Sequence, residues 1–340
     1  MTIATEKAVT LKEEVKFIPA WLSWVGSTTT CLNYLGIECD PADVAGYSGY
    51  AFTMGVHKGL CPSGPTAFDW GTLNTGINVL GRSTLAFQSG ECHCAQTGKT
   101  DITKAHCKAV YDLTAREIAE NRPVVLWGAY LPEFAVAYGV EDGKFLVKSF
   151  KACIGEPEPP IPYEDLEAPG GPYALAFPTP TGLRGKKWGD RNAIGRAVGL
   201  LHRKNEGPLY SCGIDAYDTW IAALQAGPDK PPCEKYTPFG NAYNTQCYAE
   251  AKKFAQTFLT RLAERNPFAA KEIRKAADEY LKVTEAMDRV AKLFPFPPKD
   301  EFSSEETRKE AISALRDAKS AESKAVKALE KAGEIEWPKD

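Results

Sequence analysis

The stretch that decides the fold of the N-terminal half runs from residue 123 to residue 150 and reads PVVLWGAYLPEFAVAYGVEDGKFLVKSF. It holds three short apolar runs, and the last two are separated by Asp142-Gly143, a dipeptide that supplies the positive φ angles of a tight hairpin turn. The stretch therefore predicts a strand followed by an antiparallel hairpin. Glu133 stands at the entrance to the second strand. The three runs cover 123–127, 134–140 and 145–147.

Helical patterns precede this stretch, and the first of them ends at Gly36, as expected for a helix-terminating glycine. A further apolar run at 173–177 is expected to return to the same sheet. Helices followed by a long antiparallel hairpin are typical of the α+β class, which we predict for residues 1–185. The expected helices cover 24–35, 41–45, 67–80 and 102–120.

The chain changes character in the proline- and glycine-rich stretch 155–190, and every pattern after it reads as helix. The last helix follows Ser303-Ser304-Glu305-Glu306, a capping-box pattern. We therefore predict an all-α helical bundle over residues 186–340, which packs on the first domain or forms a homodimer. The expected helices cover 190–204, 214–225, 242–265, 267–292 and 304–332.

Composition narrows the function classes. The 340 residues suffice for two ordinary domains, and a net charge of −3 gives no electrostatic basis for binding nucleic acid or a membrane. The apolar runs are shorter than a membrane span, and the N-terminus lacks the apolar core of a signal peptide. We expect a cytoplasmic protein whose ten cysteines are mostly free thiols. Phosphate-loop and dinucleotide motifs are absent from the sequence, so no cofactor is expected.

Three motifs carry a resemblance to a known family. They are NYLG at 33–36, NRPVVLWG at 121–128 and the hairpin EFAVAYGVEDGKFLV at 133–147. Their order resembles the papain-like fold of the C39-type peptidase group, and more closely the N-terminal domain of the butirosin biosynthesis protein H group. The resemblance covers about residues 15–180. The helical second half is similar to the all-helical extension that often follows in that group.

The resemblance implies where a catalytic triad would stand. Papain-like chemistry uses a cysteine at the N-terminus of the first helix, a histidine opening the central strand and an Asn or Asp that orients it. Carried onto this sequence, these positions hold Ser23, Glu133 and a residue near Ser149. A glutamate of ordinary acidity is a poor base for a serine. The usual triad is therefore absent.

The first functional hypothesis is a small-molecule-binding protein on this scaffold, with Glu133 as a polar anchor for a cationic or hydroxylated ligand. The expected site is the cleft between the two domains, because such interfaces are preferred ligand sites. An aromatic and acidic helix of the second half is expected to cover it, although simple packing between domains explains that helix as well. The expected ligand-binding residues are Trp21, Ser23, Trp24, Tyr50, Glu133, Asp215 and Trp220.

The second hypothesis is a cysteine-dependent acyltransferase or amide hydrolase. The segment 46–70 is rich in glycine and aromatic residues and holds His57 and Cys61 four positions apart. Cys61 would be a thiol nucleophile activated by His57, with backbone N–H groups of the following turn near the oxyanion. Alternatively, Cys61 is a small buried residue and His57 bonds a loop carbonyl.

Cys92-His93-Cys94 together with His106-Cys107 supply residue types that bind zinc. The C-x-C spacing is not that of the usual zinc knuckle, C-x2-C. Adjacent residues on a helix point about 100° apart, so at most one of the second pair would join a site. The sequence therefore predicts no metal site, and ordinary thiols are the expected state of these cysteines.

Overall fold

The computed structural model describes residues 8–204, 207–227, 237–298 and 304–339. Its contacts divide the chain into two compact units, one formed by Met1–Val44 with Ile77–Arg184 and the other by Ala45–Gly76 with Gly185–Asp340. The break after Arg184 lies next to the predicted one at residue 185. The segment Ala45–Gly76 differs from the prediction, because the structure groups it with the helical unit and not with the α+β unit.

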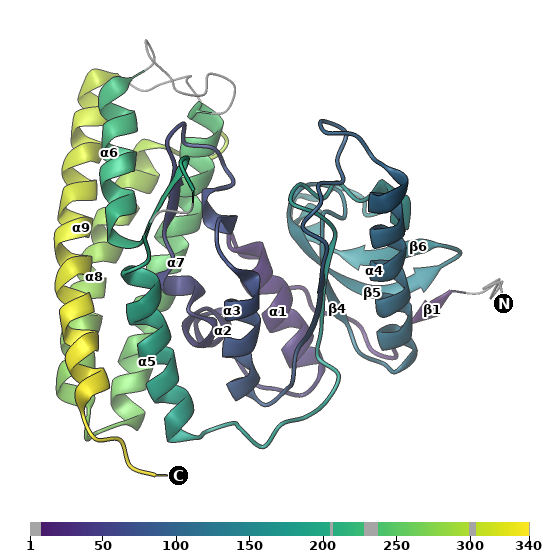
Figure 1. Ribbon diagram of the computed structural model, residues 1–340, viewed down its shortest axis with the longest axis horizontal. Coiled ribbons are helices and arrows are strands. Elements are labelled where there is room, and N and C mark those ends of the chain that lie inside the picture. Colours follow the sequence, from purple (N-terminus) through teal and green to yellow (C-terminus); the bar gives the residue numbers. More distant parts are fainter. Residues whose placement is uncertain (1–7, 205–206, 228–236, 299–303, 340) are drawn as a thin grey trace. The chain divides into compact units, whose positions relative to one another are not determined.

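The first unit is built on an antiparallel sheet with the strand order β3-β8-β4-β5-β6-β7, and β1 pairs with β5 (Figure 1). The predicted hairpin is confirmed: Asp142 and Gly143 have φ angles of 44° and 74° and join β5 to β6. The predicted return strand is also confirmed, since β8 pairs with β4. The strands are β1 (Val9–Thr10), β3 (Leu85–Gln88), β4 (Val124–Trp127), β5 (Phe134–Glu141), β6 (Lys144–Lys148), β7 (Ile161–Pro162) and β8 (Tyr173–Ala176).

Two helices pack against this sheet, α1 (Ser23–Tyr34) against β4 and β5, and α4 (Asp101–Ala119) across β5 and β8 (Figure 1). A capping box at Thr100 starts α4, as its side chain accepts a hydrogen bond from the Thr103 N–H. Every second residue of a strand faces the same side. The small residues Ala135 and Ala137 accordingly pack in the cluster with α4, while Val136 between them faces away from it. The middle strands are thus buried on both faces.

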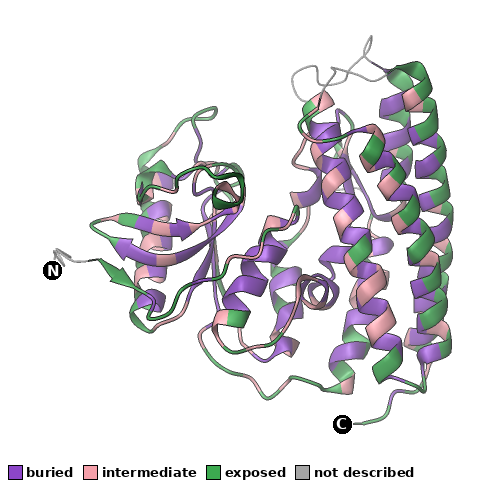
Figure 2. Ribbon diagram, turned by 180° about the vertical axis from the view of Figure 1, so that it is seen from behind, coloured by how far each residue is buried: buried purple, intermediate pink, exposed green. Residues whose placement is uncertain are grey.

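The second unit is mainly helical, and its long helices α7, α8 and α9 pack in series (Figure 1). The prediction that only helices follow the linker was wrong at β9, which pairs with β2 in a two-stranded sheet. Figure 2 shows buried and exposed positions side by side along the long helices. The elements are α2 (Pro41–Ser48), which begins in the first unit, β2 (Gly55–His57), α3 (Trp70–Gly76), α5 (Lys187–Leu201), β9 (Tyr210–Cys212), α6 (Ala216–Ala226), α7 (Thr237–Arg265), α8 (Ala270–Leu293) and α9 (Glu305–Glu334).

Segment 45–76 is held in the helical unit by close contacts with α7. The Tyr248 hydroxyl accepts a hydrogen bond of 2.9 Å from the Gly55 N–H and donates one of 2.5 Å to the Gly55 carbonyl. A Cβ atom added to Gly46 would lie 2.1 Å from the Phe258 ring, so only glycine fits there. The glycine and aromatic content of this segment therefore serves packing against α7.

A charged network lies inside the helical unit. The Lys252 ammonium lies 2.7 Å from a carboxylate oxygen of Glu322, and both side chains are fully buried. The hydroxyls of Tyr217 and Tyr280 each donate a hydrogen bond of 2.8 Å to the same carboxylate. Burial, together with the nearby Glu322 charge, raises the pKa of both tyrosines, so they remain hydrogen-bond donors. None of the helices in the described ranges is long and apolar enough to cross a bilayer.

Candidate ligand-binding site

Ser23 is the first residue of α1, and its backbone position is fixed by the start of that helix. The N–H groups of Val25 and Gly26 both donate to the Leu22 carbonyl, and Leu22 itself is buried. A Cβ atom on Gly26 would lie 2.3 Å from the Ile18 carbonyl oxygen, so the chain entering the helix passes closely over its first turn. The serine is therefore presented at the N-terminus of α1 on a rigid support.

Glu133 is placed beside it by the turn before β5. The Gly128 N–H donates to the Glu133 carbonyl at 3.0 Å, which closes this turn. The Ser23 hydroxyl donates to Glu133 Oε2 at 2.5 Å, and Ser23 Oγ accepts a hydrogen bond of 3.1 Å from the Phe134 N–H. The two residues assigned by resemblance to the nucleophile and base positions are thus in direct contact.

This arrangement suits recognition better than nucleophilic attack. The serine hydrogen is directed at a carboxylate, which in its ordinary range of acidity removes a hydroxyl proton inefficiently. The positive end of the helix dipole lies at the N-terminus of α1, next to the carboxylate that Ser23 contacts. A charged carboxylate on a rigid support is a good partner for an ammonium or a hydroxyl group.

Aromatic residues lie close to Ser23 and to Glu133 in the sequence. Trp21 is 38% exposed, two positions before Ser23, whereas Trp24 is fully buried and donates through Nε1 to the Tyr173 hydroxyl at 3.4 Å. The Phe134 ring packs against Trp127 and Tyr173 with centroid distances of 4.6 and 5.7 Å. Of the two tryptophans of this unit that were predicted to bind ligand, Trp21 offers surface to a ligand and Trp24 belongs to the core.

Ser149, near the third position of the implied triad, is hydrogen-bonded to Glu158. Ser149 is buried and donates from its hydroxyl to Glu158 Oε1 at 2.7 Å, while its N–H donates to the same oxygen at 2.5 Å. Ser149 Oγ also accepts from the Lys151 N–H at 3.2 Å. These bonds explain Ser149 as the cap of the short turn that follows β6. Sequence reasoning did not anticipate Glu158 as its partner.

Cys61 and His57 lie in the second unit, apart from the α+β unit that carries Ser23. Ser63 Oγ donates to Cys61 Sγ at 3.0 Å and also lies 2.7 Å from the Tyr210 hydroxyl. His57 Nδ1 accepts the Gly59 N–H at 2.9 Å, and burial lowers the pKa of the imidazole. Within the described ranges no hydrogen bond joins Cys61 to His57. The contact on which the nucleophile hypothesis depends is therefore missing.

The remaining predicted ligand residues also lie in the second unit. Tyr50 is 3% exposed and donates to the Pro65 carbonyl at 2.8 Å, and Trp220 is fully buried and donates to Asn241 Oδ1 at 2.8 Å. The Asp215 side chain is 55% exposed and lies 3.4 Å from Lys204 Nζ. The two aromatic residues thus belong to the core of the helical unit, and Asp215 belongs to its surface.

Two of the candidate metal ligands, His93 and Cys107, are held in ways that do not suit a metal. His93 is fully buried, with Nδ1 at 2.7 Å from Thr103 Oγ1 and Nε2 at 2.9 Å from the Glu164 carbonyl. Burial raises the pKa of Cys107 to about 12, which disfavours the thiolate that a metal needs. In the part of the chain that the structure describes, no group of three or more His, Cys, Asp or Glu residues could hold a metal ion.

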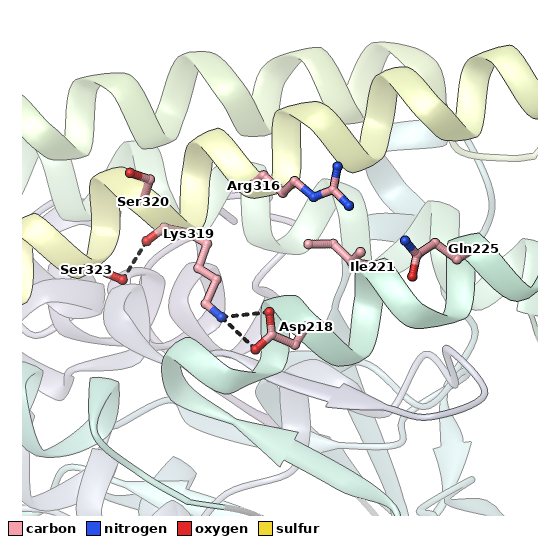
Figure 3. Close-up of a pocket in the computed structure, with 7 residues that line it drawn as sticks. All are labelled: Asp218, Ile221, Gln225, Arg316, Lys319, Ser320 and Ser323. Carbon is pink, nitrogen blue, oxygen red and sulfur yellow. Dashed lines mark hydrogen bonds and ion pairs between the residues drawn. The ribbon is translucent and has the colours of Figure 1, made fainter.

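A surface pocket of about 470 Å³ lies between α6 and α9 of the helical unit (Figure 3). Figure 3 shows the Lys319 ammonium reaching across to Asp218, with distances of 2.7 and 2.6 Å to the two carboxylate oxygens. Sequence reasoning missed this pocket because its two walls are about a hundred positions apart in the chain. Lys319 and Asp218 neutralise each other at this pocket. It is lined by Asp218, Ile221, Gln225, Arg316, Lys319, Ser320 and Ser323.

Comparison with known proteins found no family model that matches this chain and no curated protein that matches it. The resemblance to the papain-like group inferred from the three sequence motifs therefore stays a prediction.

Proposed function

We propose that the protein binds a small cationic molecule at Ser23 and Glu133, on a papain-like unit that lacks the usual Cys-His-Asn triad. The observation that carries this proposal is the 2.5 Å hydrogen bond from the Ser23 hydroxyl to Glu133 Oε2 at the N-terminus of α1. It joins the two positions at which a papain-like enzyme would hold its nucleophile and its base. Here they hold a hydroxyl and a carboxylate, which together recognise a ligand.

The chemistry of the pair selects the class of ligand. A carboxylate accepts several hydrogen bonds at once, so a primary ammonium can bond to Glu133 while Ser23 does. Charge-assisted hydrogen bonds of this kind are about twice as strong as neutral ones. Trp21 is 38% exposed two positions before Ser23 and offers aromatic surface at this end of α1, and aromatic rings attract cations. An amine that also carries hydroxyl groups fits this set of partners best.

The test compares ligands that differ only in charge. Isothermal titration of the full chain is carried out with a linear diamine against the diol of equal length, and with an amino sugar against its parent sugar. We expect the amines to bind and their neutral partners to bind far more weakly. Equal binding of an amine and its hydroxyl analogue would contradict an ionic anchor.

The matched variants are Glu133→Gln and Glu141→Gln, which remove a carboxylate before and at the end of the same strand, β5. A hydrogen bond to a charged group contributes about 1.5–3 kcal/mol, so Glu133→Gln should weaken amine binding roughly 10- to 150-fold. Glu141 is exposed beside the hairpin turn, and its variant should bind like the unaltered protein. If both variants keep full affinity, Glu133 is not the anchor.

A further inference from the structure

We propose that Cys92 and Cys94 form a thiol–disulfide exchange site, which alternates between a dithiol and an intramolecular disulfide. The two Sγ atoms lie 3.3 Å apart, and both cysteines are free thiols. A disulfide bond is about 2.05 Å long, so closing it needs the sulfurs to approach by only roughly 1 Å. This pair lies in the loop between β3 and α4, on other elements than Ser23 and Glu133.

The buried residue between them explains why the thiols face each other. The His93 N–H donates to the Ala168 carbonyl at 3.1 Å, and the Ala168 N–H donates to the His93 carbonyl at 2.8 Å, as in a strand pair. In extended backbone, the residues before and after a given position point to the same side. The His93 ring points to the other side and is fixed by its bonds to Thr103 and Glu164. Cys92 and Cys94 are therefore held together on the outer face.

Thr97 completes the site. Its hydroxyl donates to Cys92 Sγ at 3.0 Å and lies 3.2 Å from Cys94 Sγ, and the Gly98 N–H closes the turn by donating to the Cys94 carbonyl at 3.0 Å. Burial alone would raise the pKa of the Cys94 thiol, but hydrogen bonds from Thr97, Cys92 and the backbone N–H groups of Thr97 and Gln96 outweigh burial and lower it. A thiolate is the form that reacts in disulfide exchange.

The reaction uses a low-molecular-weight disulfide such as glutathione disulfide as the oxidant. Cys92 is half-buried and Cys94 is only 6% exposed, so the disulfide meets Cys92 first. The Cys92 thiolate attacks one sulfur of the disulfide, and one glutathione leaves as a thiol. Cys94 Sγ then attacks Cys92 Sγ, and the second glutathione leaves. One disulfide is reduced, one is formed in the protein, and the two thiol protons end on the two released glutathione molecules.

Trypsin makes the test direct, because cleavage after Arg82 and Lys99 releases peptide 83–99, which contains Cys92 and Cys94 and no other cysteine. The folded full chain is equilibrated in glutathione buffers of increasing oxidising strength, free thiols are blocked, and this peptide is weighed. We expect the peptide to lose two hydrogen atoms as the Cys92–Cys94 disulfide forms, and to carry no blocking agent because no free thiol remains. The exposed Cys153 is the control, and it should carry only blocking agent or glutathione.

The Cys94→Ser variant separates the attack by Cys92 on the glutathione disulfide from the closure of the protein disulfide by Cys94. Cys94→Ser should accumulate one glutathione on Cys92, because the resolving thiol is gone. The proposal is overturned if peptide 83–99 of the unaltered chain keeps both thiols in buffers that place glutathione on Cys153, or if it stops at a stable glutathione adduct on Cys92. Both outcomes are read on the unaltered chain, so they do not depend on how well a variant folds.

Discussion

Ser23 and Glu133 are separated by 110 positions in the sequence and are joined by one hydrogen bond. At the residue scale this bond defines the candidate site, because it joins a hydroxyl at the start of α1 to a carboxylate in the turn before β5. The backbone at these two positions is set by α1 and by the turn before β5, and neither depends on which side chains occupy them. The chemistry of the site should therefore change with the two side chains alone.

Replacing both residues tests this expectation. In Ser23→Cys, the neighbouring Glu133 carboxylate should raise the pKa of the new thiol through like-charge repulsion. In the double variant with Glu133→His, an imidazolium and the N-terminus of α1 should lower this pKa below the value of about 8.5 for a free cysteine. The pH dependence of iodoacetamide alkylation at residue 23, read by mass spectrometry, measures both values. Identical titration of the two variants would show that the positions do not interact.

How far this site could be predicted depends on the kind of signal. The positions of Ser23 and Glu133 were found by spacing from the motifs NYLG and EFAVAYG, which mark a helix and a strand. The bonds of Ser149 to Glu158 and the role of Tyr50 and Trp220 as core residues were not found. Those depend on which side of a turn or helix faces the interior, and an aromatic residue is compatible with a core and with a ligand site alike.

At the scale of elements, the sequence predicted the helices and the longer strands well, because their signals are local. Gly36 follows α1 with a φ of 79°, and Asp142-Gly143 turns the hairpin as expected. The four-residue strand β3 was not predicted, and neither were the two-residue strands β1 and β7. The strands β2 and β9 were also missed, since three residues each are too few to show alternation. Their pairing depends on contact between segments about 150 positions apart, which no local pattern reveals.

The buried ion pair between α7 and α9 gives a prediction at this scale. Glu322→Gln keeps the shape of the side chain but leaves the fully buried Lys252 ammonium without a counter-charge. Breaking one partner of such a pair costs about 3–5 kcal/mol, so the helical unit should unfold at clearly lower urea concentration. Circular dichroism of the full chain during urea unfolding measures this change.

Two controls make the result specific. Glu310→Gln alters an exposed glutamate of the same helix, α9, and should leave the transition unchanged. Adding Lys252→Met to Glu322→Gln removes the unpaired charge and should restore much of the stability. A double variant no more stable than Glu322→Gln alone would mean that packing, and not charge, sets the loss.

At the scale of the whole molecule, the two units are not consecutive stretches of chain. Segment 45–76 leaves the first unit and packs in the second, with Phe52 fully buried and its ring 5.5 Å from that of Tyr280. The change in composition near residue 185 predicted two domains, but it could not reveal that segment 45–76 packs in the second of them. Composition describes where a pattern changes along the chain and carries no information about which distant segment a loop packs against.

The interleaved layout predicts the behaviour of a chain cut at residue 185. That fragment keeps segment 45–76 but loses α7 and α8, so Phe52 and its neighbours are exposed and the fragment should aggregate. Replacing 45–76 in the same fragment by a flexible glycine-serine linker should yield a monomer with β-sheet signal. Size-exclusion chromatography and circular dichroism compare the two. Equal solubility of both fragments would argue that 45–76 does not need the helical unit.

The same layout determines when segment 45–76 can fold during synthesis of the chain. Gly46 packs against Phe258, so the segment around it leaves the ribosome long before its partner in α7 has been translated. At about 5–20 residues per second, the intervening two hundred or so residues take roughly 10 to 40 s to synthesise. During that interval the Phe52 ring lacks Phe258 and Tyr280, the rings against which it packs in the folded chain. An apolar segment that stays unburied during synthesis is exposed to aggregation, so the folding of segment 45–76 has to wait for the translation of α7.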